Sequence, residues 1–117
     1  FKSFMTRVGA GSLPGEIARE EAIKRGWFET AAGTGRERRS APFNFELAKK
    51  AVKINGATQV ALTKLDGVFP QCQGAKTYND LQNESKQFIN EIEKQTRIAV
   101  VLIGTGPEAL DIIDRRK

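Results

Sequence analysis

Two short apolar runs, each followed by a polar or glycine-rich turn, constrain the fold of this chain more than any other feature. The first lies in Thr58–Asp66 (TQVALTKLD) and the second is Ile98–Ile103 (IAVVLI), which leads into GTGP. Such runs between turn signals are typical of buried strands. Apolar side chains recur at helical spacing between them, so we predict a helix over residues 77–96. Together these segments form one parallel strand–helix–strand crossover.

The remaining segments predict shorter elements around this crossover. We expect a strand at 1–8, a glycine-rich turn at 9–15, a helix at 16–25, an irregular segment at 27–43, a helix at 45–54 and a terminal helix after Pro107. Asn44 suits the N-cap of the 45–54 helix, and Gly56 suits its C-terminal end. The fold class is therefore α/β: part of a P-loop-NTPase-like, mostly parallel sheet flanked by helices.

The polar residues that follow the two central strands are expected to meet. Parallel strands end at one edge of a sheet, where ligands commonly bind. This places Lys64 and Asp66 beside the Gly104–Gly106 turn. An ionised Asp accepts two hydrogen bonds at once, and guanine offers an adjacent pair of N–H donors where adenine presents an acceptor. TKLD alone more often marks a solvated turn, but the second glycine turn favours a base pocket.

A second polar feature is the arginine-rich segment Gly33–Arg39 (GTGRERR). Backbone N–H groups and Thr34 could bind a carboxylate, with guanidinium forks behind them. A flexible basic surface that contacts RNA phosphates explains the same residues. The residues alone leave both interpretations open.

Composition narrows the function classes. A net charge of +5 favours anionic partners without choosing among them. The only cysteine, Cys72, excludes an internal disulfide and favours a reducing compartment. The absence of histidine excludes His-based catalysis and His metal sites. No run is long and apolar enough for a membrane span. The chain opens like the end of a strand, so we expect it to be the C-terminal piece of a longer enzyme.

Four stretches in register resemble adenylosuccinate synthetase in its shorter, archaeal-like form. They are TRVGAGSLPGE (6–16), GTGRERR (33–39), NGATQVALTKLD (55–66) and GTGP (104–107). They resemble the C-terminal third of that enzyme, so residues 1–117 would be the C-terminal part of its single domain. Some positions depart from the usual pattern: Gly33 stands where threonine is common, and Gly104 where serine is common.

The resemblance implies a carbon–nitrogen ligase of purine biosynthesis. The family joins IMP and L-aspartate, using GTP and Mg²⁺, to give adenylosuccinate, GDP and phosphate. The resemblance further implies that the enzyme is a cytoplasmic homodimer with no membrane or nucleic-acid partner. Two alternatives stay open: a fragment of a switch-type GTPase, which shares the strand and TKxD, and a basic RNA-binding domain that uses the arginines.

The resemblance also implies a role for individual residues. The GTP-binding residues would be Arg38, Lys64, Leu65, Asp66, Gly104, Thr105 and Gly106, the IMP-binding residues Val8 and Arg36, and the aspartate-binding residues Ala32, Gly33, Thr34, Gly35, Arg36, Glu37 and Arg38. The aspartate loop would span about 31–39, and the guanine pocket 63–66 and 104–107. No catalytic residue or metal ligand is expected in this chain, because the family's catalytic Asp, its His and its phosphate loop belong to the N-terminal part. We therefore expect this chain alone to be inactive.

Overall fold

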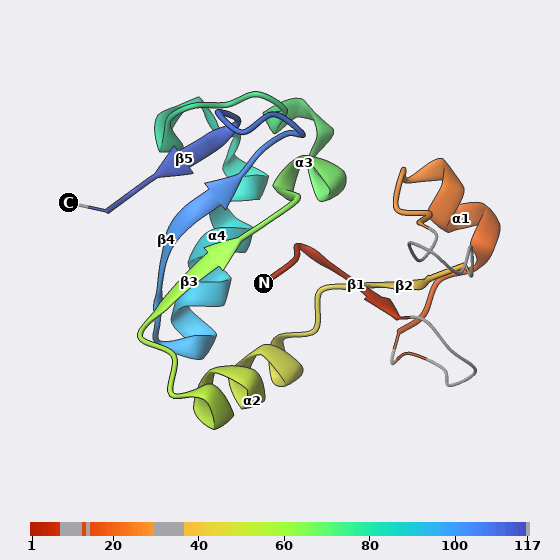
Figure 1. The fold of residues 1–117 in the computed structure, drawn as a ribbon, viewed down its shortest axis with the longest axis horizontal. Coiled ribbons are helices and arrows are strands. Elements are labelled where there is room, and N and C mark those ends of the chain that lie inside the picture. The colour runs from red at the N-terminus through yellow and green to blue at the C-terminus, as the bar shows by residue number, and fades with distance from the viewer. Residues whose placement is uncertain (8–12, 14, 30–36, 117) are drawn as a thin grey trace.

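The structure is a computed structural model that describes residues 1–7, 13, 15–29 and 37–116 (Figure 1). Its strands are β1 (Phe4–Arg7), β2 (Arg39–Pro42), β3 (Gln59–Leu62), β4 (Ala99–Gly104) and β5 (Ile112–Asp114). Its α-helices are α1 (Arg19–Lys24), α2 (Phe45–Asn55), α3 (Leu65–Val68) and α4 (Asn83–Thr96), with 3₁₀ turns at Pro70–Cys72 and Tyr78–Asp80. The described part of the chain is therefore mixed α/β.

The three-stranded sheet has the order β3-β4-β5 and contains the predicted crossover. β3 and β4 are parallel, with Val60 opposite Val100 and Leu62 opposite Ile103. α4 connects them and lies across one face of the sheet, as Figure 1 shows. The sequence prediction of a parallel strand–helix–strand unit is thus confirmed.

The sequence prediction of a terminal helix after Pro107 is wrong. Residues 105–111 form a turn, and β5 then runs antiparallel along the outer edge of β4, with Ile113 opposite Ile103. Pairing with β5 satisfies backbone groups at the edge of β4 and leaves Ile113 only 2% exposed. A short helix at this position would offer neither benefit.

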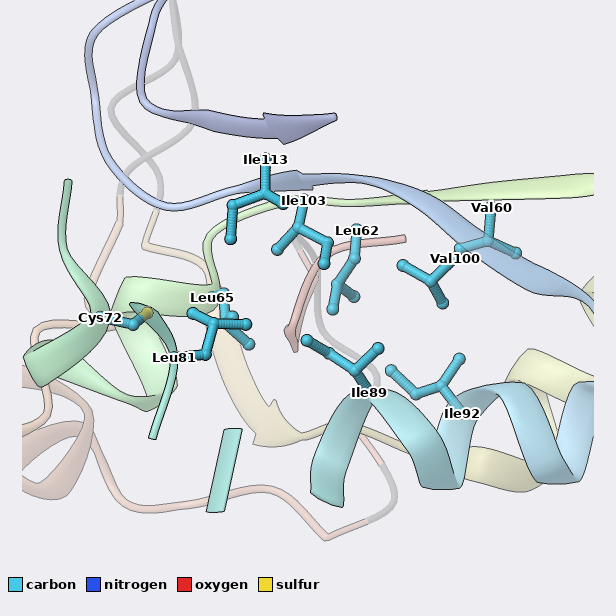
Figure 2. Close-up of a cluster of buried hydrophobic side chains, with 10 residues drawn as sticks. All are labelled: Val60, Leu62, Leu65, Cys72, Leu81, Ile89, Ile92, Val100, Ile103 and Ile113. Atoms are coloured by element: carbon cyan, nitrogen blue, oxygen red, sulfur yellow. The ribbon is translucent and has the colours of Figure 1, made fainter. Parts of the chain in front are cut away.

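The main core lies between the sheet, α4 and the segment after α3 (Figure 2). Its members are buried apolar side chains: Val60, Leu62, Leu65, Cys72, Leu81, Ile89, Ile92, Val100, Ile103 and Ile113. Ile89 and Ile92 are fully buried and lie on the face of α4 that is turned to the sheet. The helical spacing read from the sequence therefore marks the core, as expected.

α2 begins and ends as its sequence predicts. The Asn44 side chain accepts a hydrogen bond from the Leu47 N–H at 3.1 Å. Gly56 is left-handed at φ 59°, which allows its N–H to bond back to the helix. α4 begins later than predicted, at residue 83, because Thr77 and Asp80 cap each other's backbone in a separate 3₁₀ turn.

The N-terminal region is a small ribbon in which β1 and β2 pair antiparallel, with Phe4 opposite Pro42 and Arg7 opposite Arg39. The sequence prediction of an irregular segment over 27–43 therefore missed β2. α1 starts at residue 19 rather than 16, because the Ile17 N–H bonds to the Ser40 carbonyl of β2 at 2.9 Å instead.

The ribbon is attached to the end of β3 by backbone hydrogen bonds. The Ser3 N–H donates to the Thr63 carbonyl at 2.9 Å, and the Thr63 N–H donates to the Phe1 carbonyl at 2.7 Å. Residues 1–3 therefore extend the sheet beside β3, just before the TKLD turn.

Among the helices of the described residues, none has the length and apolar character that a membrane span requires.

Candidate functional site

The TKLD turn is held rigidly at the end of β3. Leu65 is fully buried and anchors α3 in the core. Lys64, directly before it, adopts the left-handed conformation at φ 57°. A non-glycine residue there costs about 1–2 kcal/mol, so the surrounding packing must enforce the turn.

The turn after β4 lies beside it, as the sequence predicts. A Cβ placed on Gly104 would lie 3.5 Å from the Thr63 Cα and 3.7 Å from the Lys64 nitrogen. A pocket of about 260 Å³ lies between the two turns and is lined by Phe4, Gly26, Lys64, Asp66, Gly67, Gln73, Gly106 and Pro107. The structure thus brings Lys64, Asp66 and Gly106 to one cavity.

Two predicted base contacts point elsewhere. Leu65 and Thr105 are both fully buried, and the Thr105 hydroxyl donates to the Ala75 carbonyl at 2.8 Å. Both side chains are therefore committed within the fold. The backbone of Thr105 is committed as well, because its N–H donates to the Asp111 carbonyl and its carbonyl accepts from the Gly74 N–H at 3.1 Å.

Asp66 has a carboxylate with no hydrogen bond or ion pair to any described residue, although the residue is half-buried. Burial raises the pKa of the nearby Cys72 thiol to about 11, and the negative charge of Asp66 contributes to that shift. Asp66 therefore offers unused acceptor capacity beside the pocket.

A hydrogen-bonded turn shapes the Gly106 side of the pocket. The Thr105 N–H donates to the Asp111 carbonyl at 2.8 Å, and the Lys76 ammonium lies 2.7 Å from the Asp111 carboxylate. The Lys76 hydrogen bond, and then the Glu108 N–H, hold the pKa of Asp111 below its usual value. A Cβ on Gly106 would lie 2.9 Å from the Asp111 Cγ, so the turn needs glycine there.

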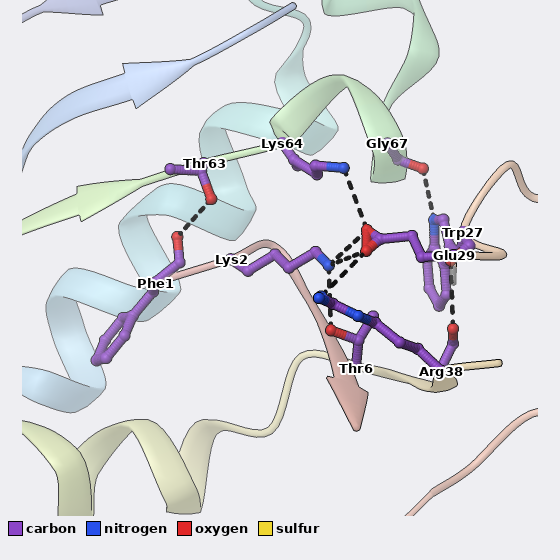
Figure 3. A network of polar contacts seen from close by, with 10 residues as sticks. Phe1, Lys2, Thr6, Trp27, Glu29, Arg38, Thr63, Lys64 and Gly67 are labelled. Atoms are coloured by element: carbon purple, nitrogen blue, oxygen red, sulfur yellow. Dashed lines mark hydrogen bonds and ion pairs between the residues drawn. The ribbon is translucent and has the colours of Figure 1, made fainter. Parts of the chain in front are cut away.

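Lys64 does not extend freely into solvent but takes part in a charged network (Figure 3). Its ammonium lies 3.1 Å from Glu29 Oε1, and the Lys2 ammonium lies 2.6 Å from the same oxygen. Arg38 approaches Glu29 Oε2 at 3.6 Å. Glu29 is not predicted from the sequence, because a single acid in a loop carries no pattern that reveals partners in three other segments.

The arginine-rich segment is described only in part. Of the expected IMP and aspartate ligands, Val8, Ala32, Gly33, Thr34, Gly35 and Arg36 lie outside the described residues. Glu37 pairs with Arg19 at 2.9 Å, and Arg39 pairs with Glu16 at 3.2 Å. These pairs line a polar cavity of about 350 Å³ together with Arg38.

A metal ion has no evident set of ligands in this part of the protein. Within the ranges 1–7, 15–29 and 37–116, no three His, Cys, Asp or Glu side chains cluster to hold one.

Comparisons with known proteins give the geometry a context. The adenylosuccinate synthetase sequence profile matches residues 1–70. Over 116 residues the chain is 51% identical to adenylosuccinate synthetase of Methanocaldococcus jannaschii and 48% identical to that of Pyrococcus horikoshii. Each alignment covers 99% of this chain and 34% of the relative, so the chain spans about a third of the curated relatives' length.

Solved structures agree on the fold. A fully ligated adenylosuccinate synthetase from Plasmodium falciparum superimposes with a TM-score of 0.84 at 20% identity, over 98% of this chain and 38% of that one. A cyanophage succinoaminodeoxyadenylate synthetase bound to dGMP and dATP superimposes with a TM-score of 0.68 at 19% identity. This superposition covers 100% of this chain and 32% of the cyanophage chain. The profile match and the half-identical archaeal relatives together show that this chain belongs to the adenylosuccinate synthetase family.

Proposed function

We propose that this chain supplies the guanine-binding and aspartate-binding parts of an enzyme that joins IMP and L-aspartate at the expense of GTP. The observation that carries the proposal is the parallel pairing of β3 with β4, which places Lys64, Asp66 and Gly106 around one pocket. Family membership favours this ligase over a switch-type GTPase or an RNA-binding domain.

Asp66 is the residue that selects the base. Its carboxylate, which has no partner among the described residues, accepts hydrogen bonds from the guanine N1–H and the exocyclic amine, whereas adenine cannot donate both. Bonds to a charged group contribute about 1.5–3 kcal/mol each, so two of them separate the bases strongly. The Lys64 stem lies along the base face, and the backbone of residues 104–106 closes over it.

The arginine-bearing segment presents the amino acid. Residues 32–38 bind the carboxylates of aspartate, Arg36 also reaches the IMP ribose, and Val8 lies against IMP. Arg38 also contacts GTP, and its position 3.6 Å from Glu29 sets it near Lys64. A dianionic amino acid beside nucleotide phosphates needs several cations, which this segment supplies.

The catalytic Asp and His, the phosphate loop and the Mg²⁺ ligands belong to the rest of the enzyme. This chain by itself is accordingly an inactive part of a cytoplasmic, dimeric enzyme.

The test uses a chimaeric enzyme in which this chain replaces the matching segment of the Methanocaldococcus jannaschii protein, to which it is 51% identical. We expect GTP consumption that needs both IMP and aspartate. Asp66→Asn should raise the GTP requirement by about a hundredfold or more and improve use of xanthosine triphosphate, because the amide donates to the xanthine 2-oxygen.

Asp114→Asn is the matched control, because Asp114 is an exposed carboxylate paired with Arg116 and should leave nucleotide use unchanged. The base comparison must include ATP, since the cyanophage neighbour is described as using dATP as its energy donor. An Asp66→Asn enzyme with the original nucleotide preference would refute the role of Asp66.

A further inference from the structure

Glu29 is the meeting point of side chains from three other segments. Figure 3 shows Lys2 at the start of the chain, Arg38 before β2 and Lys64 after β3, all directed at its carboxylate. Lys2 bonds both oxygens, at 2.6 and 2.9 Å, and Lys64 bonds Oε1 at 3.1 Å. Arg38 lies 3.6 Å from Oε2.

The Glu29–Lys2 part of the network is partly withdrawn from water, whereas the Lys64 side chain is 54% exposed and that of Arg38 is 35% exposed. The Glu29 side chain is 21% exposed and that of Lys2 is 23% exposed. Burial opposes the ionised form of Glu29, but hydrogen bonds from Lys2 and Lys64 outweigh it and keep the carboxyl pKa below its usual value. One carboxylate therefore holds three cations that would otherwise repel one another.

Glu29 also acts through its backbone. Its carbonyl accepts a hydrogen bond from the Arg38 N–H at 2.8 Å. Arg38 Nε is buried without a hydrogen-bond partner among the described residues, and the guanidinium forms its ion pair with Glu29 through Nη1.

We propose that Glu29 is a positioning residue that fixes Lys64 and Arg38 relative to each other, and so couples the guanine pocket to the aspartate-binding segment. This inference rests on the proposed function, which gives Lys64 to the base and Arg38 to both GTP and aspartate. A long lysine side chain loses much rotamer freedom on binding a base, and the Glu29 contact removes that freedom beforehand.

Glu29→Gln in the chimaeric enzyme tests the coupling. We expect the half-saturating concentrations of GTP and of aspartate each to rise about tenfold, with a smaller change in kcat, because the neutral amide holds neither cation firmly. Glu21→Gln is the matched control: its partner Arg25 lies on the exposed side of α1, and both requirements should stay unchanged. A rise in only one requirement, or an equal loss from Glu21→Gln, overturns the coupling.

A double-mutant cycle separates positioning from general loss of structure. In a Lys64→Ala background, Glu29→Gln should raise the GTP requirement by clearly less than about tenfold, because only the part of its effect that acts through Arg38 remains. It should still raise the aspartate requirement through Arg38. Fully additive effects on GTP would show that Glu29 does not act through Lys64. Glu29→Asp keeps the charge and should raise the GTP and aspartate requirements less than Glu29→Gln does. It replaces Glu29→Gln in the test if that variant fails to fold.

Acetylation of lysines in the 117-residue chain gives a readout that needs no turnover. Lys64 should react several-fold faster with acetic anhydride in Glu29→Gln, since its ammonium has lost its carboxylate partner, while exposed Lys50 reacts equally in both proteins. Equal Lys64 rates overturn the positioning role. A chimaera that consumes GTP without needing aspartate defeats the proposed function instead, and the labelling still decides the Glu29 contact.

Discussion

The two regions of this protein are organised by different forces. The C-terminal region, residues 43–116, surrounds a continuous apolar core in which Ile89, Ile92 and Ile103 are fully buried. The N-terminal region, residues 1–42, has a small cluster of three buried apolar residues, Phe4, Ala22 and Trp27. It attaches to the larger region through polar contacts at Thr63, Lys64 and Gly67, and through apolar packing of Phe1 on the main core and of Val68 on the small cluster.

This difference shows how each half of the candidate site is made rigid. The backbone of the turn that carries Asp66 is anchored mainly by the fully buried Leu65, although the Lys64 ammonium also contacts Glu29. The segment that carries Arg38 is fixed by hydrogen bonds and ion pairs to Glu29. Substitutions that remove a charge should therefore disturb the backbone of the Asp66 turn less than that of the segment that carries Arg38, although they weaken ligand binding in both.

The largest expected effect tests the dependence of the C-terminal region on its core. Ile89→Ala should lower the free energy of unfolding by about 2–5 kcal/mol, because it leaves a cavity between α4 and the sheet. Ile54→Ala is the control: Ile54 is 82% exposed and should change stability by less than about 0.5 kcal/mol. Urea unfolding followed by circular dichroism at 222 nm measures both.

Trp27 extends this test to the N-terminal region. It is the only tryptophan, stacks on Phe4 with ring centroids 4.7 Å apart, and donates its indole N–H to the Gly67 carbonyl at 2.6 Å. Its fluorescence should change at a lower urea concentration than the circular dichroism, since the small cluster buries little apolar area. Coincident transitions would contradict the division into two regions.

Sequence patterns predicted the C-terminal region far better than the N-terminal one. The parallel pairing of β3 and β4 and the capping of α2 at Asn44 follow from local signals: apolar runs, an N-cap residue and a glycine. β2 depends on pairing with β1, which lies far from it in the sequence, and residues 39–42 include a proline and no strongly apolar residue. β5 is only 3 residues long and pairs with β4 across the turn at 105–111. No local pattern marks such edge strands.

The residues of the candidate site also differ in how well the sequence predicts them. Lys64, Asp66 and Gly106 were placed together from the topology of parallel strands, which holds for any sheet of this kind. Glu29 was not predicted, because its role depends on where Lys2, Arg38 and Lys64 arrive in space. A charge network drawn from separate segments has no sequence spacing.

A smaller effect is expected at the two glycines of the turn after β4. Gly106→Ala should cost about 1–3 kcal/mol, because its Cβ would meet the Asp111 carboxylate carbon at 2.9 Å. Gly104→Ala should be close to neutral, since its nearest neighbours would lie at 3.5–3.8 Å, an ordinary contact distance.

Urea unfolding of the two glycine variants measures the difference, and nucleotide titration of the chimaeric enzyme shows whether it reaches the pocket. Only Gly106→Ala should weaken GTP binding. Equal behaviour of the two variants would mean that the Lys76–Asp111 pair does not shape this turn.

The smallest expected effect reports on the charge of Asp66 inside the packed region. With its pKa raised to about 11, mainly by burial, the Cys72 thiol carries about a hundredfold less thiolate at pH 8.5 than an ordinary cysteine. Iodoacetamide should therefore label it very slowly, and faster as the pH rises. Asp66→Asn removes a negative charge that opposes the thiolate, so labelling should quicken by about two- to fivefold.

Glu46→Gln removes an equal charge at the exposed start of α2, and its labelling rate should match that of the parent chain. Rates measured in urea, where both variants are unfolded, remove any difference in intrinsic reactivity. If Asp66→Asn labels at the parent rate, the carboxylate lies farther from Cys72 than the structure places it. Packing would then fix the backbone of the TKLD turn but not the side chain of Asp66. The distinction between a region held by packing and a region held by charged contacts would then apply within the pocket, between the backbone and the side chain of one residue.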